Sequence, residues 1–110
     1  MQPFLNRSVI IIIPKKPFYD WINYLDPKDP IDDLEDYNSL LLPDDFDIDE
    51  ATEFIKENYS SIFESHLFGM WTEETDWPQK RTLKIFKEWF NWHFSAVIID
   101  TVEDEPIEVF

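Results

Sequence analysis

The stretch from Trp77 to Phe94, WPQKRTLKIFKEWFNWHF, constrains the fold of this chain more than any other segment. At the helical period of about 100° per residue, its apolar side chains fall on an arc of roughly 200°. Lysine, arginine, glutamate and asparagine occupy the remaining strip. An apolar arc this wide exceeds the stripe of an ordinary surface helix, so the pattern predicts a core helix over 77–94.

Three other segments predict β-strands. Residues 7–15, RSVIIIIPK, hold five consecutive β-branched residues bounded by Pro14, which is typical of a strand buried on both faces in the middle of a sheet. A short strand over 39–42 is expected to end at Pro43, because proline lacks an amide donor. The segment SAVIIDTV, residues 95–102, predicts the third strand.

Two further segments predict helices. Apolar residues repeat at i, i+3, i+4 and i+7 over 18–25, directly after Pro17, which suits the first turn of a helix. A second helix is expected to begin after Asp47, with Glu50 as its capping-box partner. We expect that helix to end at Gly69, the only glycine of the chain.

The order strand, helix, strand, helix, helix, strand predicts an α/β or α+β fold. Because helical crossovers connect parallel strands, we expect a three-stranded, mostly parallel sheet with three main helices. The first strand is expected in the centre, in the order 2-1-3. A chain of 110 residues suits one globular domain, 1–110, with an acidic tail over 103–110 that we expect to fray.

The charge balance narrows the classes of partner. With 24 acidic and 9 basic residues, and a net charge of -15, direct binding to nucleic acid or to an anionic membrane is disfavoured. The longest apolar run, 9–13, is much shorter than the ~20 residues of a membrane helix. There is no cysteine and no secretory pattern, so we expect a cytoplasmic protein.

Acidic residues concentrate in one part of the sequence. Half of them lie between Asp20 and Glu50, where Lys28 is the only base. The concentration favours a face that binds a basic protein partner, although acidity that serves only solubility is the alternative. The candidate interaction residues are Asp32, Asp33, Glu35, Asp36, Asp44 and Asp45, with Trp71 and Trp77 as aromatic anchors.

The core-helix segment carries a basic strip formed by Lys80, Arg81, Lys84 and Lys87. We expect acidic elements such as the 26–36 connector to neutralise this strip, and an anion site, for example for phosphate, is the alternative. The wide apolar arc also predicts a surface patch drawn from Phe68, Met70, Trp71, Trp77 and Trp92. A homodimer would bury such a patch.

No known pattern of catalytic or metal-binding residues is complete in this sequence. Asp45, Asp47 and Asp49 match the first ligand positions of an EF-hand loop, but Glu50 replaces its glycine and Lys56 its final glutamate. The two histidines, His66 and His93, are expected on buried faces of different helices. Glycine-rich phosphate loops and the GxSxG elbow each need more than one glycine, and the chain has only one. Neither motif can therefore be present, although Ser60, Ser61 and Ser65 lie near His66 in the sequence. We therefore expect no metal and no cofactor.

Two segments, NRSVIIIIPKKPFYDW and WPQKRTLKIFKEWF, resemble a group of small acidic bacterial proteins of unassigned function. The resemblance implies a bacterial cytoplasmic protein, and it carries no site or activity with it. From the residues, the leading hypothesis is a protein-interaction module without enzymatic activity. The alternatives are a carboxylate-based or cation-dependent hydrolase, and an immunity or inhibitor protein directed against a basic toxin.

Overall fold

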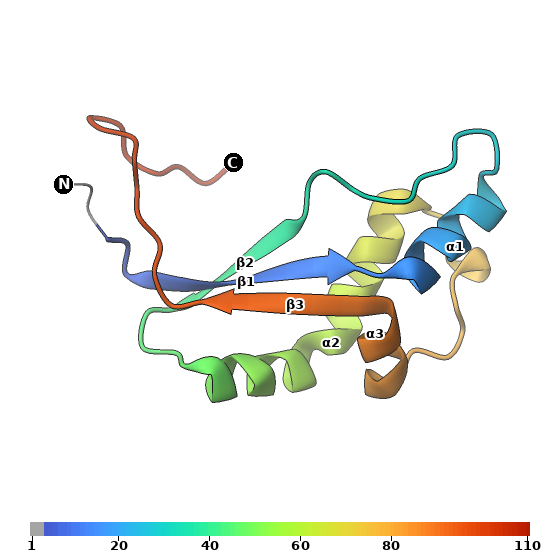
Figure 1. The fold of residues 1–110 in the computed structure, drawn as a ribbon, viewed down its shortest axis with the longest axis horizontal. Helices are drawn as coiled ribbons and strands as arrows, with labels where there is room; N and C mark the ends of the chain where they lie inside the picture. Colours follow the sequence, from blue (N-terminus) through green and yellow to red (C-terminus); the bar gives the residue numbers. More distant parts are fainter. Residues whose placement is uncertain (1–3) are drawn as a thin grey trace.

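The structure, a computed structural model, describes residues 4–110 (Figure 1). It consists of a three-stranded sheet with helices packed on one face and at one end. The elements are β1 (Arg7–Pro14), α1 (Lys16–Leu25), β2 (Asn38–Pro43), α2 (Ile48–Met70), the 3-10 turn η1 (Glu74–Asp76), α3 (Leu83–Trp89) and β3 (Phe90–Ser95). None of the helices described is long and apolar enough to cross a membrane.

All neighbouring strands of the sheet are antiparallel, so the prediction of a mostly parallel sheet is wrong. The strand order is β2-β1-β3, and β1 is central as expected. The direction differs because α1 continues beyond the end of β1 instead of running back along the sheet (Figure 1). The 26–37 connector then leads directly into β2, which returns beside β1 in the opposite direction.

The predicted helix over 77–94 divides into a short helix and a strand. Thr82 Oγ1 accepts a hydrogen bond from Ile85 N at 3.2 Å, so α3 begins at Leu83, and it ends at Trp89. The residues that follow, FNWHFS, alternate between apolar and polar and form β3 against β1. Aromatic residues favour strands, and pairing with the isoleucine-rich β1 overrides the helical period.

The predicted third strand over 95–102 is also wrong. Beyond Ser95, the segment is linked to the start of the chain by a hydrogen bond from Leu5 N to Ile98 O, at 2.8 Å, and by an isolated bridge between Phe4 and Ile99. The tail over 103–110 has no helix or strand, and each of its side chains is exposed.

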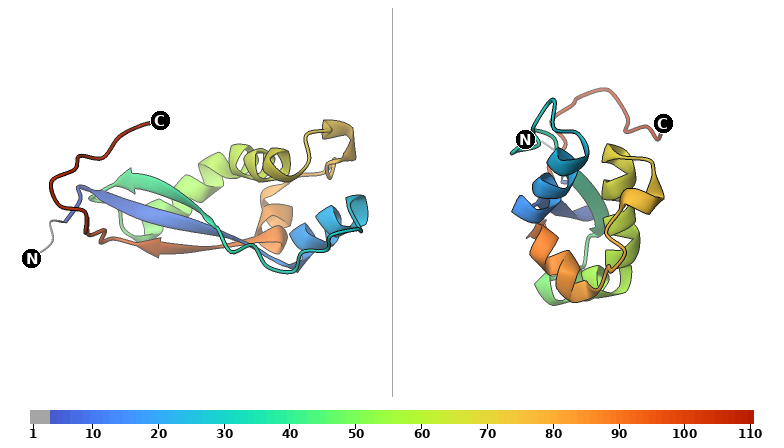
Figure 2. Two further views of the ribbon diagram at one scale, coloured as in Figure 1. Left: turned by 90° about the horizontal axis from the view of Figure 1, so that it is seen from above. Right: turned by 90° about the vertical axis from the view of Figure 1, so that its right-hand side faces the viewer.

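The sheet is covered on only one face. Along β1, Ser8, Ile10, Ile12 and Pro14 are buried, whereas Val9, Ile11 and Ile13 between them are only half-buried. α2 lies along one side of the sheet and α1 lies beyond its end, as Figure 2 shows. The expectation that β1 is buried on both faces is therefore wrong.

The core lies between the covered face of the sheet and the helices. Its centre is a group of aromatic rings in which Phe63 of α2 lies 6.0 Å from Phe86 of α3 and 5.3 Å from Phe90 of β3, between ring centroids. Its buried apolar members are Ile10, Ile12, Phe18, Tyr19, Leu42, Ala51, Ile55, Ile62, Phe63, Leu67, Trp77, Phe86 and Phe90.

The long helix α2 begins as predicted. Asp47 Oδ1 accepts from Glu50 N at 2.9 Å, and Glu50 Oε1 accepts from Asp47 N at 3.3 Å, which completes the capping box. The other end differs from the prediction, because α2 continues through Gly69 to Met70 and is followed by an extended Trp71. Gly69 does not adopt a positive φ angle, so it is not a left-handed helix cap.

Candidate interaction groove between β2 and α2

One flank of α2 borders β2, and apart from Phe54, which packs against the edge of the core, its residues lie outside the core. Phe54, Asn58, Ser61, Ser65 and Gly69 recur every three or four residues, so they lie along one line of the helix. All five are exposed or half-buried. Serine, asparagine and glycine are too small to fill the space beside the strand, and a groove remains there.

The groove consists of three consecutive pockets that share lining residues, and we call it the β2–α2 groove. The first pocket, about 240 Å³, is lined by Phe46, Glu50, Glu53, Phe54 and Glu57. The second, about 250 Å³, shares Phe54 with the first and is also lined by Asn38, Leu40, Asn58, Ser61, Ile62, Ser65 and His66. The third, about 230 Å³, shares Asn38, Ser65 and His66 with the second and extends to Leu34, Asp36, Tyr37, Gly69 and Met70.

Gly69 supplies separate evidence that the groove is open. A Cβ atom added to this residue would meet no other atom within 4 Å. Close backbone packing therefore does not require glycine at this position. The absence of a side chain instead leaves free space in the wall of the third pocket.

The first pocket combines aromatic side chains with carboxylates. The rings of Phe46 and Phe54 are half-buried, and the three glutamates around them are exposed. Glu50 is engaged in the capping box, while Glu53 has only a loose ion pair with Lys56, at 3.9 Å. An apolar surface rimmed by negative charge can accept the alkyl chain and the charged head of a lysine or arginine.

The middle of the groove is closed from below by His66, which is 9% exposed. Its Nδ1 lies 2.8 Å from Ile62 O, and since the carbonyl can only accept, Nδ1 carries a proton. Nε2 then accepts from Asn38 Nδ2, at 3.3 Å. Burial is the main influence on this ring and lowers the pKa of His66, so the neutral form is favoured.

The far end of the groove is formed by the 26–37 connector. Three hydrogen bonds hold the connector against α1. Asn23 Nδ2 donates to Ile31 O at 2.6 Å, and Ile31 N donates back to Asn23 Oδ1 at 2.8 Å. Leu34 N donates to Tyr19 Oη at 3.0 Å. The Tyr37 hydroxyl donates to Asp33 Oδ1 at 2.9 Å, and this hydrogen bond raises the pKa of Tyr37. The predicted interaction residue Asp36 lies here, in the third pocket.

The other predicted acidic residues do not form one continuous face. Asp44 and Asp45 lie in the turn after β2, next to the first pocket, whereas Glu35 and Asp36 precede the other end of this strand. Asp32 and Asp33 border a separate pocket that also contains Lys15, Lys16 and Asp20. All six predicted acids are exposed, and β2 separates them into two groups.

The two tryptophans predicted as anchors lie together and away from this groove. Trp77 is only 6% exposed, and its Nε1 donates to Trp71 O at 2.7 Å. Trp71 is half-buried and donates through Nε1 to Asp76 Oδ2 at 3.0 Å. Trp77 is thus a core residue, and it does not belong to an exposed aromatic patch.

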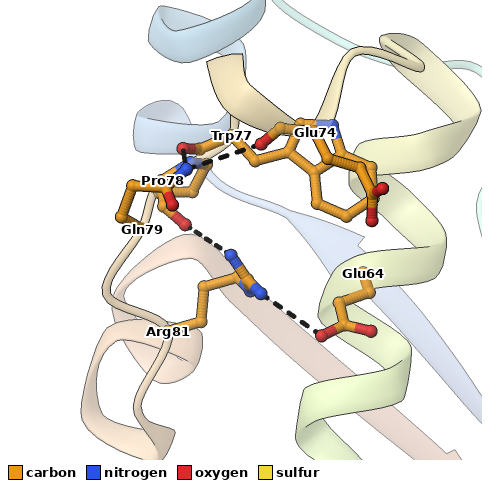
Figure 3. A network of polar contacts seen from close by, with 6 residues as sticks. All are labelled: Glu64, Glu74, Trp77, Pro78, Gln79 and Arg81. Carbon is orange, nitrogen blue, oxygen red and sulfur yellow. Dashed lines mark hydrogen bonds and ion pairs between the residues drawn. The ribbon is translucent and has the colours of Figure 1, made fainter.

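The predicted basic strip is partly neutralised within the chain. Arg81 Nη2 lies 3.3 Å from Glu64 Oε1, Nη1 donates to Pro78 O at 2.8 Å, and the guanidinium lies 5.9 Å from the centroid of Trp77 (Figure 3). Lys80, Lys84 and Lys87 are exposed, without an ion pair among residues 4–110. The partner of Arg81 is α2, and the 26–36 connector takes no part.

The histidines do not form a joint site. His66 lies beneath the groove, whereas His93 is exposed on β3 opposite Ile11, on the open face of the sheet. His93 was expected to be buried in a helix, and the helix-to-strand change at Phe90 explains the difference. In the part of the chain described, no three His, Asp or Glu side chains are placed to hold a metal ion.

Most of the groove was not anticipated from the sequence. The small residues Ser61, Ser65 and Gly69 follow at intervals of four, which is a readable signal, but their strand neighbour is not encoded locally. Comparison of the chain with protein-family models, with curated proteins and with solved structures finds no match in any of the three.

Proposed function

We propose that this protein is a non-enzymatic interaction module that binds a basic segment of another protein in the β2–α2 groove. The observation that carries the proposal is the first pocket, which is lined by three glutamates, Glu50, Glu53 and Glu57, together with Phe46 and Phe54. No lysine or arginine lines any of the three pockets of the groove. A cytoplasmic location is part of the proposal and is supported by the absence of cysteine.

The charge of the whole molecule supports the same partner class. Among residues 4–110 only three ion pairs occur, and they engage Asp20, Glu53 and Glu64. Of 24 acidic residues, 24 − 3 = 21 therefore have no ion pair within that range. Such a field accelerates the encounter with a basic segment, and the aromatic rings of the first pocket then supply apolar contact.

The experiment begins with a display library of random twelve-residue peptides, selected on the immobilised protein. Enriched peptides are synthesised, and their affinity is measured by fluorescence anisotropy at low and moderate ionic strength. We expect lysine and arginine to be enriched and the affinity to fall as salt is added. Enriched peptides without basic residues would contradict the proposal.

A matched pair of variants separates the groove from overall charge. Glu53→Lys with Glu57→Lys changes the net charge by +4, as does Glu103→Lys with Glu105→Lys in the exposed tail. We expect the groove variant to lose about tenfold or more in affinity, equivalent to ~1.4 kcal/mol, and the tail variant to change by less than about threefold. Equal losses in both variants would show that only net charge attracts the peptide.

A further inference from the structure

We infer that the partner segment binds as a fourth strand, paired with the outer edge of β2 and with alternate side chains directed into the groove. The inference rests on the proposed function and adds the mode of binding. Strand addition beside a helix gives affinity through main-chain hydrogen bonds and specificity through pockets for every second side chain. The β2–α2 groove has both parts, an edge strand and a row of pockets.

The hydrogen-bonding pattern identifies the free groups on β2. Lys15 N donates to Trp89 O at 2.7 Å, and this pair continues the β1–β3 register. In an antiparallel pair every second residue forms the hydrogen bonds, so the odd-numbered residues of β1 are hydrogen-bonded to β3. The backbone groups of the even-numbered residues of β1 therefore form hydrogen bonds with β2, where Ile10 lies opposite Leu40 and Ile12 lies opposite Asn38. The backbone groups of Ser39 and Leu41 consequently point away from the sheet.

Nothing in the described chain covers this edge. Ser39 is exposed and Leu41 is 58% exposed. Among residues 4–110, no backbone hydrogen bond outside the sheet engages either residue. Pro43, which has no N–H to offer, occupies the next outward position, so donors on the free edge end at Leu41.

The dimensions of strand and helix agree. The groove follows α2 from Glu53 to Gly69, a distance of roughly 24 Å at ~1.5 Å per residue. An extended segment covers that length with about seven residues at ~3.3 Å each. β2 itself has six residues, so strand and groove offer similar lengths for pairing.

Charge selects the occupant. The first pocket favours a lysine or arginine at one end of the bound segment, and the neutral residues Asn58, Ser61 and Ser65 beyond it suit small or apolar side chains. The chain's own tail, EDEPIEVF, carries four acidic residues and no base. The tail is therefore repelled from this groove, whether it belongs to the same molecule or to a second copy.

The test uses a basic peptide from the selection described above, synthesised with a single N-methyl group at each position in turn. Strand pairing predicts alternation: methylation weakens binding about three- to tenfold at every second residue, where a hydrogen bond is lost, and has little effect between. Equal sensitivity at all positions, or none, would overturn the inference. If alternation is absent while the Glu53/Glu57 variant still weakens binding, the proposed function stands and strand addition fails.

A pair of variants of the protein itself also tests whether the peptide pairs with the edge of β2. Ser39→Pro removes an outward N–H without removing a hydrogen bond to β1, and Ser39→Ala keeps that N–H. We expect weaker peptide binding only for Ser39→Pro, with circular dichroism used to verify folding; if this variant does not fold, the N-methyl series decides. Undiminished binding by folded Ser39→Pro contradicts strand addition.

The remaining outcomes concern other occupants. A dimer of the free protein in sedimentation, converted to monomer by Ser39→Pro, would mean that a second copy occupies the edge and would overturn the inference. If no basic peptide binds at low ionic strength, the proposed function and the inference fail together.

Discussion

Asn38 of β2 and His66 of α2 meet at the base of the groove, with Asn38 Nδ2 3.3 Å from His66 Nε2. This contact joins the edge strand to the helix that stands beside it. The tautomer of the ring is fixed at the other nitrogen, where Nδ1 donates to Ile62 O at 2.8 Å. With Nδ1 protonated and Nε2 accepting, this arrangement corresponds to the neutral histidine that burial favours.

The free energy of unfolding should depend on pH through His66. Burial lowers the pKa of His66 below its ordinary 6.5, so the folded state binds fewer protons than the unfolded state. The stabilisation is complete above about pH 6.5 and decreases as the pH falls toward the lower folded-state pKa, by at most ~1.4 kcal/mol per pH unit. The hydrogen bond between the ring and Ile62 O opposes this lowering of the pKa in part.

Urea denaturation of the wild type and of His66→Gln at pH 7.5 and pH 5.5 measures this dependence. Many carboxylates are common to both proteins, so the difference between them isolates the histidine. We expect the wild type to lose stability relative to His66→Gln at the lower pH. A difference that stays constant between the two pH values would show that His66 titrates normally in the fold.

Phe63 should contribute strongly to stability, because it is fully buried between Phe86 and Phe90. Phe63→Ala is expected to lower the free energy of unfolding by about 3–5 kcal/mol, measured by chemical denaturation. Phe68, on the same helix and 59% exposed, supplies the control. Phe68→Ala should change stability by less than about 0.5 kcal/mol. Similar losses of stability for both variants would contradict the assignment of Phe63 to the core and of Phe68 to the exposed side of α2.

The capping box at the start of α2 should be measurable in the same assay. Asp47→Ala removes the acceptor for Glu50 N and is expected to destabilise the protein by about 1 kcal/mol. Asp45→Ala removes the same charge two residues earlier, outside the box. If the two substitutions are equally destabilising, general electrostatics would explain the effect of Asp47.

Salt should stabilise the folded protein. Most of the 24 acidic residues have no ion pair within residues 4–110, so their mutual repulsion opposes folding. Screening over a Debye length of about 10 Å at 0.1 M weakens this repulsion. We expect the thermal midpoint to rise between low and moderate ionic strength in calorimetry. A flat or falling midpoint would contradict the picture of unpaired surface charge.

The parts of the fold that the sequence predicted are those with local causes. β-branched residues favour the strand β1, Pro17 lies in the first turn of α1, and Asp47 with Glu50 caps the start of α2. The prediction of one helix over 77–94 is wrong because the aromatic residues of this segment fit two periods. Phe86 and Trp89 fit the helical period. Phe90, Trp92 and Phe94 fit both the helical period and the alternation of a strand. Pairing with β1 decides between these periods, and that contact is distant in sequence.

The candidate site could be predicted from the sequence even less well than the fold. The acidic residues were found, but β2 divides them into two groups, and the most concentrated aromatic and acidic pocket uses Glu53 and Glu57 beyond the predicted cluster. The groove needs the direction of β2, which depends on where α1 leads the chain. No local pattern in residues 26–37 encodes that direction.

Nuclear magnetic resonance can locate a bound basic peptide on the β2–α2 groove. A selected basic peptide is titrated into ¹⁵N-labelled protein, and the shifted amide signals are mapped onto the fold. We expect shifts along β2, at Ser39 and Leu41 above all, and along α2 from Glu53 to Gly69. Shifts confined to the open face around Ile11 and His93, to the 103–110 tail, or absent throughout would contradict this expectation.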